Sequence, residues 1–352
     1  MARMGTSGEA GRDPFAPFRE AGPCPSYYIG RPVEMTGEPV RFNCWGMPRL
    51  HVISPAMDSR ILTVVFTDVA GSTRLYARVS DAEAVGLVRE VERRVREALP
   101  SFRGAFVKAT EEGPLLTFEA PADAVRCAGE LHRICDGLAR TRRTDLFARV
   151  AIHSGEVILG EGDVHGNTVN LAARLLSLAG GCETCVTEAA WAALEAADRA
   201  GFTDHGPEVF KGFACVTRVW RKSHPNPFLE STARLQTMRE ADAPVWAARE
   251  LPRRRRYRLV FDLAGATGAV ELAEGEMRMV GGAPRGAMAV SDPALSESHA
   301  AFAVVEGVLW VFDLQGASGL LCRGRRIHRR RPLEIGSVVE LPVGTVMVDG
   351  GA

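Results

Sequence analysis

No apolar run in this chain is long enough to cross a membrane. A membrane helix needs roughly 18–20 consecutive apolar residues, and every apolar run here is shorter. The first residues, MARMGTSGEAGRDPF, also lack the apolar core of a secretory signal. We therefore expect a cytoplasmic protein with no transmembrane segment.

The chain also lacks an excess of either charge. Its 43 Lys and Arg residues balance its 43 Asp and Glu residues, so the formal net charge at pH 7 is zero. This balance gives no support to nucleic acid, or to any other general polyanion, as a partner. The 352 residues are 46% hydrophobic and 24% charged, which is ordinary for a globular protein of two or three domains.

Clustered cysteines and internal repeats are absent as well. The eight cysteines are scattered, which fits reduced thiols in a cytoplasm rather than a disulfide framework. Cys182 and Cys185 form an isolated CxxC spacing. Because no second pair lies nearby, we interpret both as core or surface cysteines rather than as zinc ligands.

Shifts in composition divide the chain into four segments. Residues 1–58 are rich in Pro and Gly and predict a mostly irregular N-terminal arm. Residues 60–222 predict one α/β domain, 223–254 a polar linker, and 257–350 an all-β domain. The basic run Arg253–Arg256 is interpreted as a solvated face, with a membrane surface or an acidic partner as the alternative.

Residues 60–222 predict a ferredoxin-like βαββαβ core. Strands are expected at 61–66, 105–110, 115–118, 147–153 and 156–159, and helices from Asp81, through 124–138 and over 167–178. Ser154 and Gly155 are expected to turn the chain between the last two strands. The order strand, helix, hairpin, helix, strand is that of the ferredoxin-like fold. The fold class is therefore α/β (α+β), followed by a small all-β sandwich.

The candidate chemistry begins at Asp68, which follows a buried strand and precedes the turn Gly71-Ser72-Thr73. A carboxylate there suits a hard cation beside a phosphate, although capping of the next helix would explain it equally well. Glu112, at the tip of the neighbouring hairpin, favours the cation. In a ferredoxin-like sheet the two places lie side by side, so both carboxylates can share a pair of divalent ions.

Four further polar residues extend this candidate site. Lys108 lies on the same hairpin as Glu112, and Asp163, Asn170 and Arg174 follow later at offsets of seven and four. One helical turn separates Asn170 from Arg174, so the two share a helix face. An amide and a guanidinium on one face can orient a ribose and stabilise a transferring phosphate. Singly, each residue could instead be a solvated lysine, a loop aspartate or a local cap.

With these residues in view, the sequence resembles the class III nucleotide cyclases over about residues 60–222. The blocks FTDVAGST, IHSGEV and DVHGNTVNLAARL, the hairpin and the closing FKG stand in the family's order and at its spacings. The resemblance implies that Lys108 and Asp163 read the adenine edge, since a guanylate cyclase commonly has Glu and a small polar residue there. Asn170 would orient the ribose and Arg174 would stabilise the transition state.

The resemblance also implies a metal site and a homodimer. Asp68, the backbone carbonyl of Val69 and Glu112 would hold two Mg²⁺ or Mn²⁺ ions per site, and each site would be assembled from two protomers. The family's hairpin usually reads Thr-Gly-Asp-Gly, whereas here it reads Thr-Glu111-Glu112-Gly. The longer Glu112 side chain moves its carboxylate by about 1 Å, which can slow a reaction on the order of a hundredfold. Glu111 stands where a turn favours glycine.

Residues 257–350 predict the sandwich, with strands at 257–263, 276–280, 300–305, 308–313 and 338–348. Three motifs, VG at 280–281, LSESHA at 295–300 and DLQGASG at 313–319, resemble a forkhead-associated (FHA) domain. That family holds phosphothreonine with two arginines, a serine and an asparagine.

Most of the phosphate-binding residues of that family are replaced in this chain. Gly282 and Glu297 stand at the two arginine positions and Ser318 at the asparagine position, while Ser296 and a structural histidine, His299, match. With two cations lost and an acid gained, we expect the sandwich fold with lost or altered phosphopeptide binding.

Three functions follow as expectations. The first is an adenylate cyclase of intracellular signalling that converts ATP to 3′,5′-cyclic AMP and pyrophosphate, with an activity that is weak or favours manganese. The second is a nucleotide-binding pseudocyclase that acts as a signalling scaffold. The third is an adaptor that binds a protein partner through the FHA-like domain.

Overall fold

The computed structural model describes residues 58–70, 79–110, 113–144, 146–160, 162–225, 251–282, 288–290, 292–314 and 319–349. The chain divides into two compact units, one with the elements of residues 59–223 and the other with those of residues 256–349. The predicted N-terminal arm up to residue 57, and residues 226–250 of the predicted linker, lie outside the described residues. None of the helices in the described ranges is both long and apolar enough to span a membrane.

The first unit is built on one sheet with the strand order β2-β3-β1-β4-β6-β8-β7, and β5 pairs with β4. The strands are β1 (Ser59–Ala70), β2 (Gly104–Thr110), β3 (Gly113–Phe118), β4 (Phe147–Leu159), β5 (Val164–His165), β6 (Glu183–Thr187), β7 (Thr203–Val209) and β8 (Val216–Ser223). The order β2-β3-β1-β4, with helices between β1 and β2 and between β3 and β4, confirms the predicted ferredoxin-like core.

The helical segments of this unit are α2 (Asp81–Ala98), the 3₁₀ turn η1 (Leu99–Phe102), α3 (Pro121–Arg142), α4 (Asn167–Leu176), α5 (Glu188–Trp191) and α6 (Ala196–Arg199). The predicted start of α2 at Asp81 is confirmed, because Ser80 and Glu83 form a capping box that satisfies two backbone N–H groups. The last helix of the core ends at Leu176, two residues before the predicted end.

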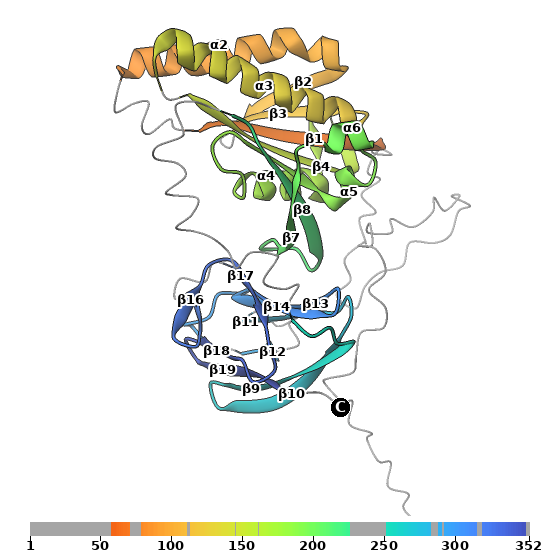
Figure 1. Ribbon diagram of the computed structural model, residues 1–352, viewed down its shortest axis with the longest axis vertical. Helices are drawn as coiled ribbons and strands as arrows, with labels where there is room; N and C mark the ends of the chain where they lie inside the picture. The colour runs from red at the N-terminus through yellow and green to blue at the C-terminus, as the bar shows by residue number, and fades with distance from the viewer. Residues whose placement is uncertain are drawn as a thin grey trace, which may run out of the picture. The chain divides into compact units, whose positions relative to one another are not determined.

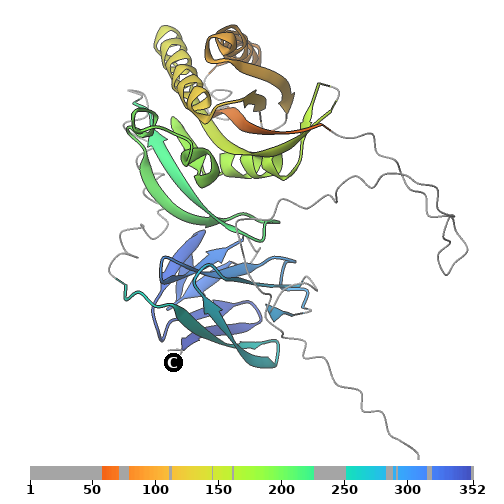
Figure 2. The same cartoon turned by 90° about the vertical axis from the view of Figure 1, so that its right-hand side faces the viewer.

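The sheet has a helical layer on each face (Figure 1, Figure 2). The α2–α3 face buries Val65 of β1 in one apolar cluster, and the α4 face buries Val64 and Phe66 in another. Alternate side chains of a strand point to opposite faces, so Asp68 shares the α4 face with Phe66.

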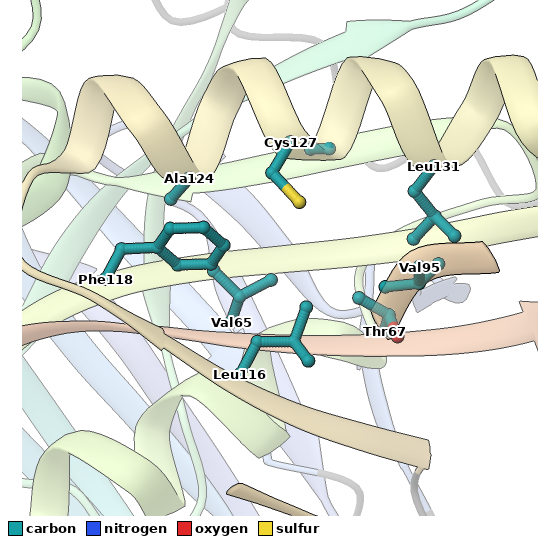
Figure 3. A pocket seen from close by; sticks show the side chains of 9 residues that line it. Val65, Thr67, Val95, Leu116, Phe118, Ala124, Cys127 and Leu131 are labelled. Atoms are coloured by element: carbon teal, nitrogen blue, oxygen red, sulfur yellow. The ribbon is translucent and has the colours of Figure 1, made fainter. Parts of the chain in front are cut away.

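A small cavity lies in the α2–α3 layer, and Figure 3 shows the Cys127 thiol and the Leu131 side chain pointing toward β1 and β3. Its lining is apolar apart from Thr67 and Cys127, and burial raises the pKa of Cys127 to about 12, so the thiol stays protonated. With no convergent polar groups, this cavity is part of the core rather than a ligand pocket.

The predicted turn at Ser154 and Gly155 is wrong, because β4 runs unbroken from Phe147 to Leu159. Residues 59–70 of β1 pair with 147–158 of β4 throughout, and this ladder keeps the strand continuous. Gly155 serves a close contact instead: a Cβ there would lie 2.6 Å from the hydroxyl of Thr168 in α4. The glycine therefore lets the first turn of α4 pack onto the strand.

The second unit is a β-sandwich, as predicted, with one sheet in the order β10-β9-β19-β18-β15-β16 and another in the order β12-β11-β13-β14-β17. The strands are β9 (Arg256–Leu263), β10 (Ala266–Ala273), β11 (Met277–Gly281), β12 (Met288–Ala289), β13 (Ala300–Val305), β14 (Val308–Asp313), β15 (Leu320–Cys322), β16 (Arg325–Ile327), β17 (Arg330–Leu333), β18 (Val338–Leu341) and β19 (Gly344–Asp349).

Two sequence predictions for this unit have different outcomes. The strands at 300–305 and 308–313 are confirmed to the residue. The single strand predicted at 338–348 is wrong, because β18 and β19 form a hairpin that turns at residues 342–343.

The basic run Arg253–Arg256 is exposed, which agrees with a solvated face.

Candidate functional site

Asp68 lies near the end of β1, where that strand still pairs with β4 but no longer with β3. The β1–β3 ladder covers Thr63 to Phe66, whereas the β1–β4 ladder continues to Ala70. The strand therefore ends two residues after Asp68, slightly later than the sequence predicts. Beyond Phe66, the edge of β1 that was paired with β3 lies beside Gly113, the first residue of β3.

Gly113 brings the β2–β3 hairpin against Asp68. Its φ is +119°, and a Cβ at this position would lie 1.9 Å from the carbonyl oxygen of Thr67 and 3.3 Å from the Cα of Asp68. Only glycine fits such an approach. The side-by-side placement expected for Asp68 and the hairpin is thus seen for Gly113, while Glu111 and Glu112 lie outside the described residues.

The Asp68 carboxylate is bound by a residue that the sequence analysis did not single out. Arg149 of β4 stands directly opposite Asp68 in the ladder. Its Nε donates to Oδ2 of Asp68 at 3.1 Å, and its Nη2 donates to the same oxygen. The side chains are 36% and 30% exposed, so the pair is within reach of solvent. Among the described residues, nothing donates to the other oxygen, Oδ1.

Lys108 and Asp163, which are 55 residues apart in the chain, meet at one point. The Lys108 ammonium donates to Oδ2 of Asp163 at 2.5 Å, and the backbone N–H of Val164 donates to Oδ1 at 2.8 Å. The Lys108 contact, and then the Val164 N–H, hold the pKa of Asp163 below its usual value. The lysine is therefore paired rather than merely solvated, and the aspartate is ionised and oriented.

Asn170 and Arg174 are exposed on one face of α4, as predicted, and neither side chain contacts another described residue by a hydrogen bond or ion pair. The opposite face of the helix buries Leu171 and Leu175 against the sheet. The start of the helix is fixed because Thr168 donates its hydroxyl to a carbonyl of β4 at 2.6 Å. Both side chains are therefore exposed, and neither forms a hydrogen bond or ion pair with Asp68 of the same chain, whose described partner is Arg149.

The oxygen donors at the end of β1 fit a hard divalent cation. Carboxylate and carbonyl oxygens are the ligands that Mg²⁺ and Mn²⁺ prefer, and Asp68 and the Val69 carbonyl supply one of each. The described ranges contain no group of three or more His, Cys, Asp or Glu side chains placed to hold a metal ion. Cys182 and Cys185 are buried, which agrees with the core rather than the surface alternative.

In the sandwich, the polar residues of the FHA-like motif bond to their own loop. The Ser296 hydroxyl donates to the carbonyl of Ser298 at 2.9 Å, and the Ser296 N–H donates to Nδ1 of His299 at 3.3 Å. His299 is fully buried, which agrees with a structural role. Ser318 lies outside the described residues, and no cation stands at the Gly282 or Glu297 positions.

Comparison with known proteins assigns the first unit to a family. Residues 55–222 match the family model described as the adenylate and guanylate cyclase catalytic domain. The chain therefore contains a domain of that family, as the ordered sequence blocks predicted.

Individual relatives are similar at low identity. An adenylate cyclase of Streptomyces coelicolor is 34% identical over 35% of this chain and 31% of its own length. The solved adenylate/guanylate cyclase/hydrolase of Silicibacter pomeroyi is 28% identical, with a TM-score of 0.43, over 48% of this chain and 99% of that one. The chain spans from 28% to 48% of the length of the curated relatives it matches.

A solved structure is also similar to the sandwich. The FHA domain of a Chlamydia trachomatis protein is 24% identical over 28% of this chain and 99% of that chain, with a TM-score of 0.26.

Proposed function

We propose that the protein is an adenylate cyclase, which converts ATP to 3′,5′-cyclic AMP and pyrophosphate at sites assembled from two copies of the chain. The observation that carries this proposal is the Lys108–Asp163 pair. Adenine offers an acceptor at N1 and a donor at its exocyclic amine. An ammonium beside an ionised carboxylate matches that order, whereas guanine presents the opposite order.

The chain's own residues divide the work of the reaction. Asp68, the Val69 carbonyl and Glu112 would hold the two divalent ions, which when bound lower the pKa of the ribose hydroxyl and neutralise phosphate charge. Lys108 and Asp163 orient the base. Asn170 orients the ribose, and Arg174 donates to the oxygens on which negative charge develops.

The outward orientation of α4 supports a homodimer. Asn170 and Arg174 are exposed on the face opposite the sheet, and neither is bonded to Asp68 of its own chain. A second copy related by a two-fold axis would bring them to that aspartate and complete two equivalent sites. We place the protein in intracellular signalling in the cytoplasm, with the sandwich as the contact for a protein partner.

The test is turnover of ATP and of GTP by the purified full chain, in Mg²⁺ and separately in Mn²⁺. We expect cyclic AMP from ATP, faster with Mn²⁺, and little product from GTP. Asp68→Ala should abolish the product while leaving the melting temperature within a few degrees. If no cyclic nucleotide forms at any metal or protein concentration, the proposal is wrong.

The replacement of Gly-Asp by Glu111-Glu112 favours a second candidate, a pseudocyclase that binds ATP as a signalling scaffold. It predicts saturable ATP binding without turnover. The double substitution Glu111→Gly with Glu112→Asp should then create activity. If that variant stays inactive while still binding ATP, the hairpin is not what limits the chemistry.

A further inference from the structure

Three charged residues lie in one row across the middle of the first sheet. Asp68 of β1 stands opposite Arg149 of β4, and Arg149 stands opposite Glu183 of β6. Directly paired residues of neighbouring strands project from the same face, and this is the face covered by α4. The Asp68–Arg149–Glu183 row is therefore acid, base, acid, with the base between two carboxylates.

The Arg149 guanidinium bonds to Asp68 and not to Glu183. Both hydrogen bonds that it makes to described residues go to Oδ2 of Asp68. Glu183 instead accepts from the Gly180 N–H at 2.9 Å and from the Ser223 hydroxyl at 3.3 Å, with Arg221 at 3.9 Å. A carboxylate has about four acceptor positions, so Glu183 can take a further donor from its neighbour in the row.

We propose that Arg149 is a positioning residue that competes with the divalent cation for Asp68 and so sets the metal affinity of the site. A cation that binds Oδ1 lies close to the guanidinium, which is bonded to Oδ2 of the same carboxylate. A cation that binds both oxygens must displace the guanidinium. In either case the positive charge opposes binding. When the cation binds, Arg149 turns to Glu183, which keeps the arginine paired on the same face of the sheet.

This inference rests on the proposed role of Asp68 as a metal ligand, but it concerns affinity rather than turnover. Two unit charges a few ångströms apart near a protein surface interact strongly, and exposure to solvent weakens that interaction. Neutralising Arg149 should therefore tighten binding by roughly tenfold, which corresponds to about 1.4 kcal/mol.

The experiment is a titration of the full chain with Mn²⁺ alone, without nucleotide, in which free Mn²⁺ is followed by electron paramagnetic resonance. Arg149→Gln should lower the dissociation constant roughly tenfold, and Arg149→Lys, which keeps the charge, should stay near the wild-type value. Arg126→Gln is the matched control, because Arg126 makes a similar two-bond pair with Asp198 at 3.0 Å, away from this row. That control should not change Mn²⁺ affinity.

Two further variants make the outcome decisive. Asp68→Asn should remove both the binding and its dependence on Arg149. Glu183→Gln should weaken Mn²⁺ binding in the wild-type background but not in the Arg149→Gln background, since it acts only through the arginine. Unchanged or weaker affinity in a folded Arg149→Gln protein, or equal effects of Glu183→Gln in both backgrounds, would overturn the proposal.

The result is separable from the proposed function. A protein that binds Mn²⁺ in an Arg149-dependent way but forms no cyclic AMP keeps this inference and loses the cyclase proposal. A protein that forms cyclic AMP but whose Mn²⁺ affinity is the same with and without Arg149 keeps the cyclase proposal and loses this inference.

Discussion

The two units differ in what their motif residues contact. In the first, charges far apart in the chain meet: Lys108 reaches Asp163 across 55 positions, and Arg149 reaches Asp68 across 81. In the sandwich, the Ser296 hydroxyl bonds only two residues away. The contrast shows that charged side chains from distant strands converge in the first unit, whereas Ser296 in the sandwich bonds within its own loop.

Both units nevertheless keep a glycine where two backbones touch. A Cβ at Gly113 would lie 1.9 Å from the Thr67 carbonyl oxygen, and one at Gly281 would lie 2.2 Å from the Glu297 carbonyl oxygen. These contacts belong to the scaffold rather than to the chemistry. The sandwich has such a contact at Gly281, next to Gly282, the first position where the resemblance expects a phosphate-binding arginine.

The largest effect expected in this comparison is the loss of turnover in Asp68→Ala or Arg174→Ala. In the proposed site Asp68 holds the metal and Arg174 stabilises the transferring phosphate, so either change should lower cyclic AMP formation by at least about 10²-fold. The corresponding sandwich change, Ser296→Ala, should leave the rate within about twofold. Quantifying cyclic AMP by chromatography checks all three, and equal losses would contradict the assignment of chemistry to the first unit.

A second effect concerns the choice of nucleotide. Lys108→Glu combined with Asp163→Ser reverses the order of donor and acceptor, so the ratio of kcat/KM for ATP over GTP should fall by roughly 10–100-fold. The matched control is Arg126→Gln, which removes another paired cation. If the ratio is unchanged in the double variant, the pair does not read the base.

The glycine contacts predict a matched pair of stability effects. Gly113→Ala places a methyl group inside contact distance of a carbonyl at φ +119°, and should cost about 3 kcal/mol or more in the free energy of unfolding. Gly129→Ala on α3, where nothing lies within 4 Å, should instead stabilise by about 0.5–1 kcal/mol. Denaturant unfolding of both variants measures the difference, and similar values would contradict the close approach.

The first unit should also weaken in mild acid. The ring of His132 is buried and stacked on His224 at 3.8 Å, and burial, with a smaller effect of His224, lowers the pKa of His132 to about 2. The unfolded chain binds a proton near pH 6.5 and the folded chain does not. The free energy of unfolding should therefore fall as pH drops below 6.5, by up to about 1.4 kcal/mol per pH unit from this residue.

Unfolding at pH 7.0 and pH 5.5 tests this sign. In His132→Gln the difference between the two pH values should shrink relative to the wild type. A pH slope that is the same in the variant would show that His132 is protonated in the folded state.

The smallest effect is expected in the sandwich. Phosphothreonine peptides should bind the full chain with no more than millimolar affinity, because glycine and glutamate stand where two cations are needed. Restoring them as Gly282→Arg with Glu297→Arg should improve binding in a calorimetric titration. Tight binding by the wild type would contradict the contrast between the units.

Elements whose limits are marked by the local sequence could be predicted, and elements decided by tertiary contacts could not. The strands at 300–305 and 308–313 are continuous apolar runs around a Glu-Gly turn, so their limits are visible in the sequence. Ser154 and Gly155 carry the composition of a turn, but a ladder with β1 and a close contact with α4 decide their structure. Tertiary context overrides local preference there.

The candidate site divides in the same way. Lys108 and Asp163 could be paired from their ordered motifs alone. Arg149 could not be found, because its position opposite Asp68 depends on the register between strands about 80 residues apart. Such a register is set by how the buried faces of both strands pack in the folded sheet, which the composition of one strand does not show.

The uninterrupted course of β4 has one more consequence. Arg149 sits near its beginning and Gly155, on which α4 rests, lies six positions later, at a distance of roughly 20 Å along the strand. In the proposed dimer, the aspartate end serves one reaction centre and the helix end serves the other. In that dimer β4 would be a continuous backbone connection between the two proposed centres.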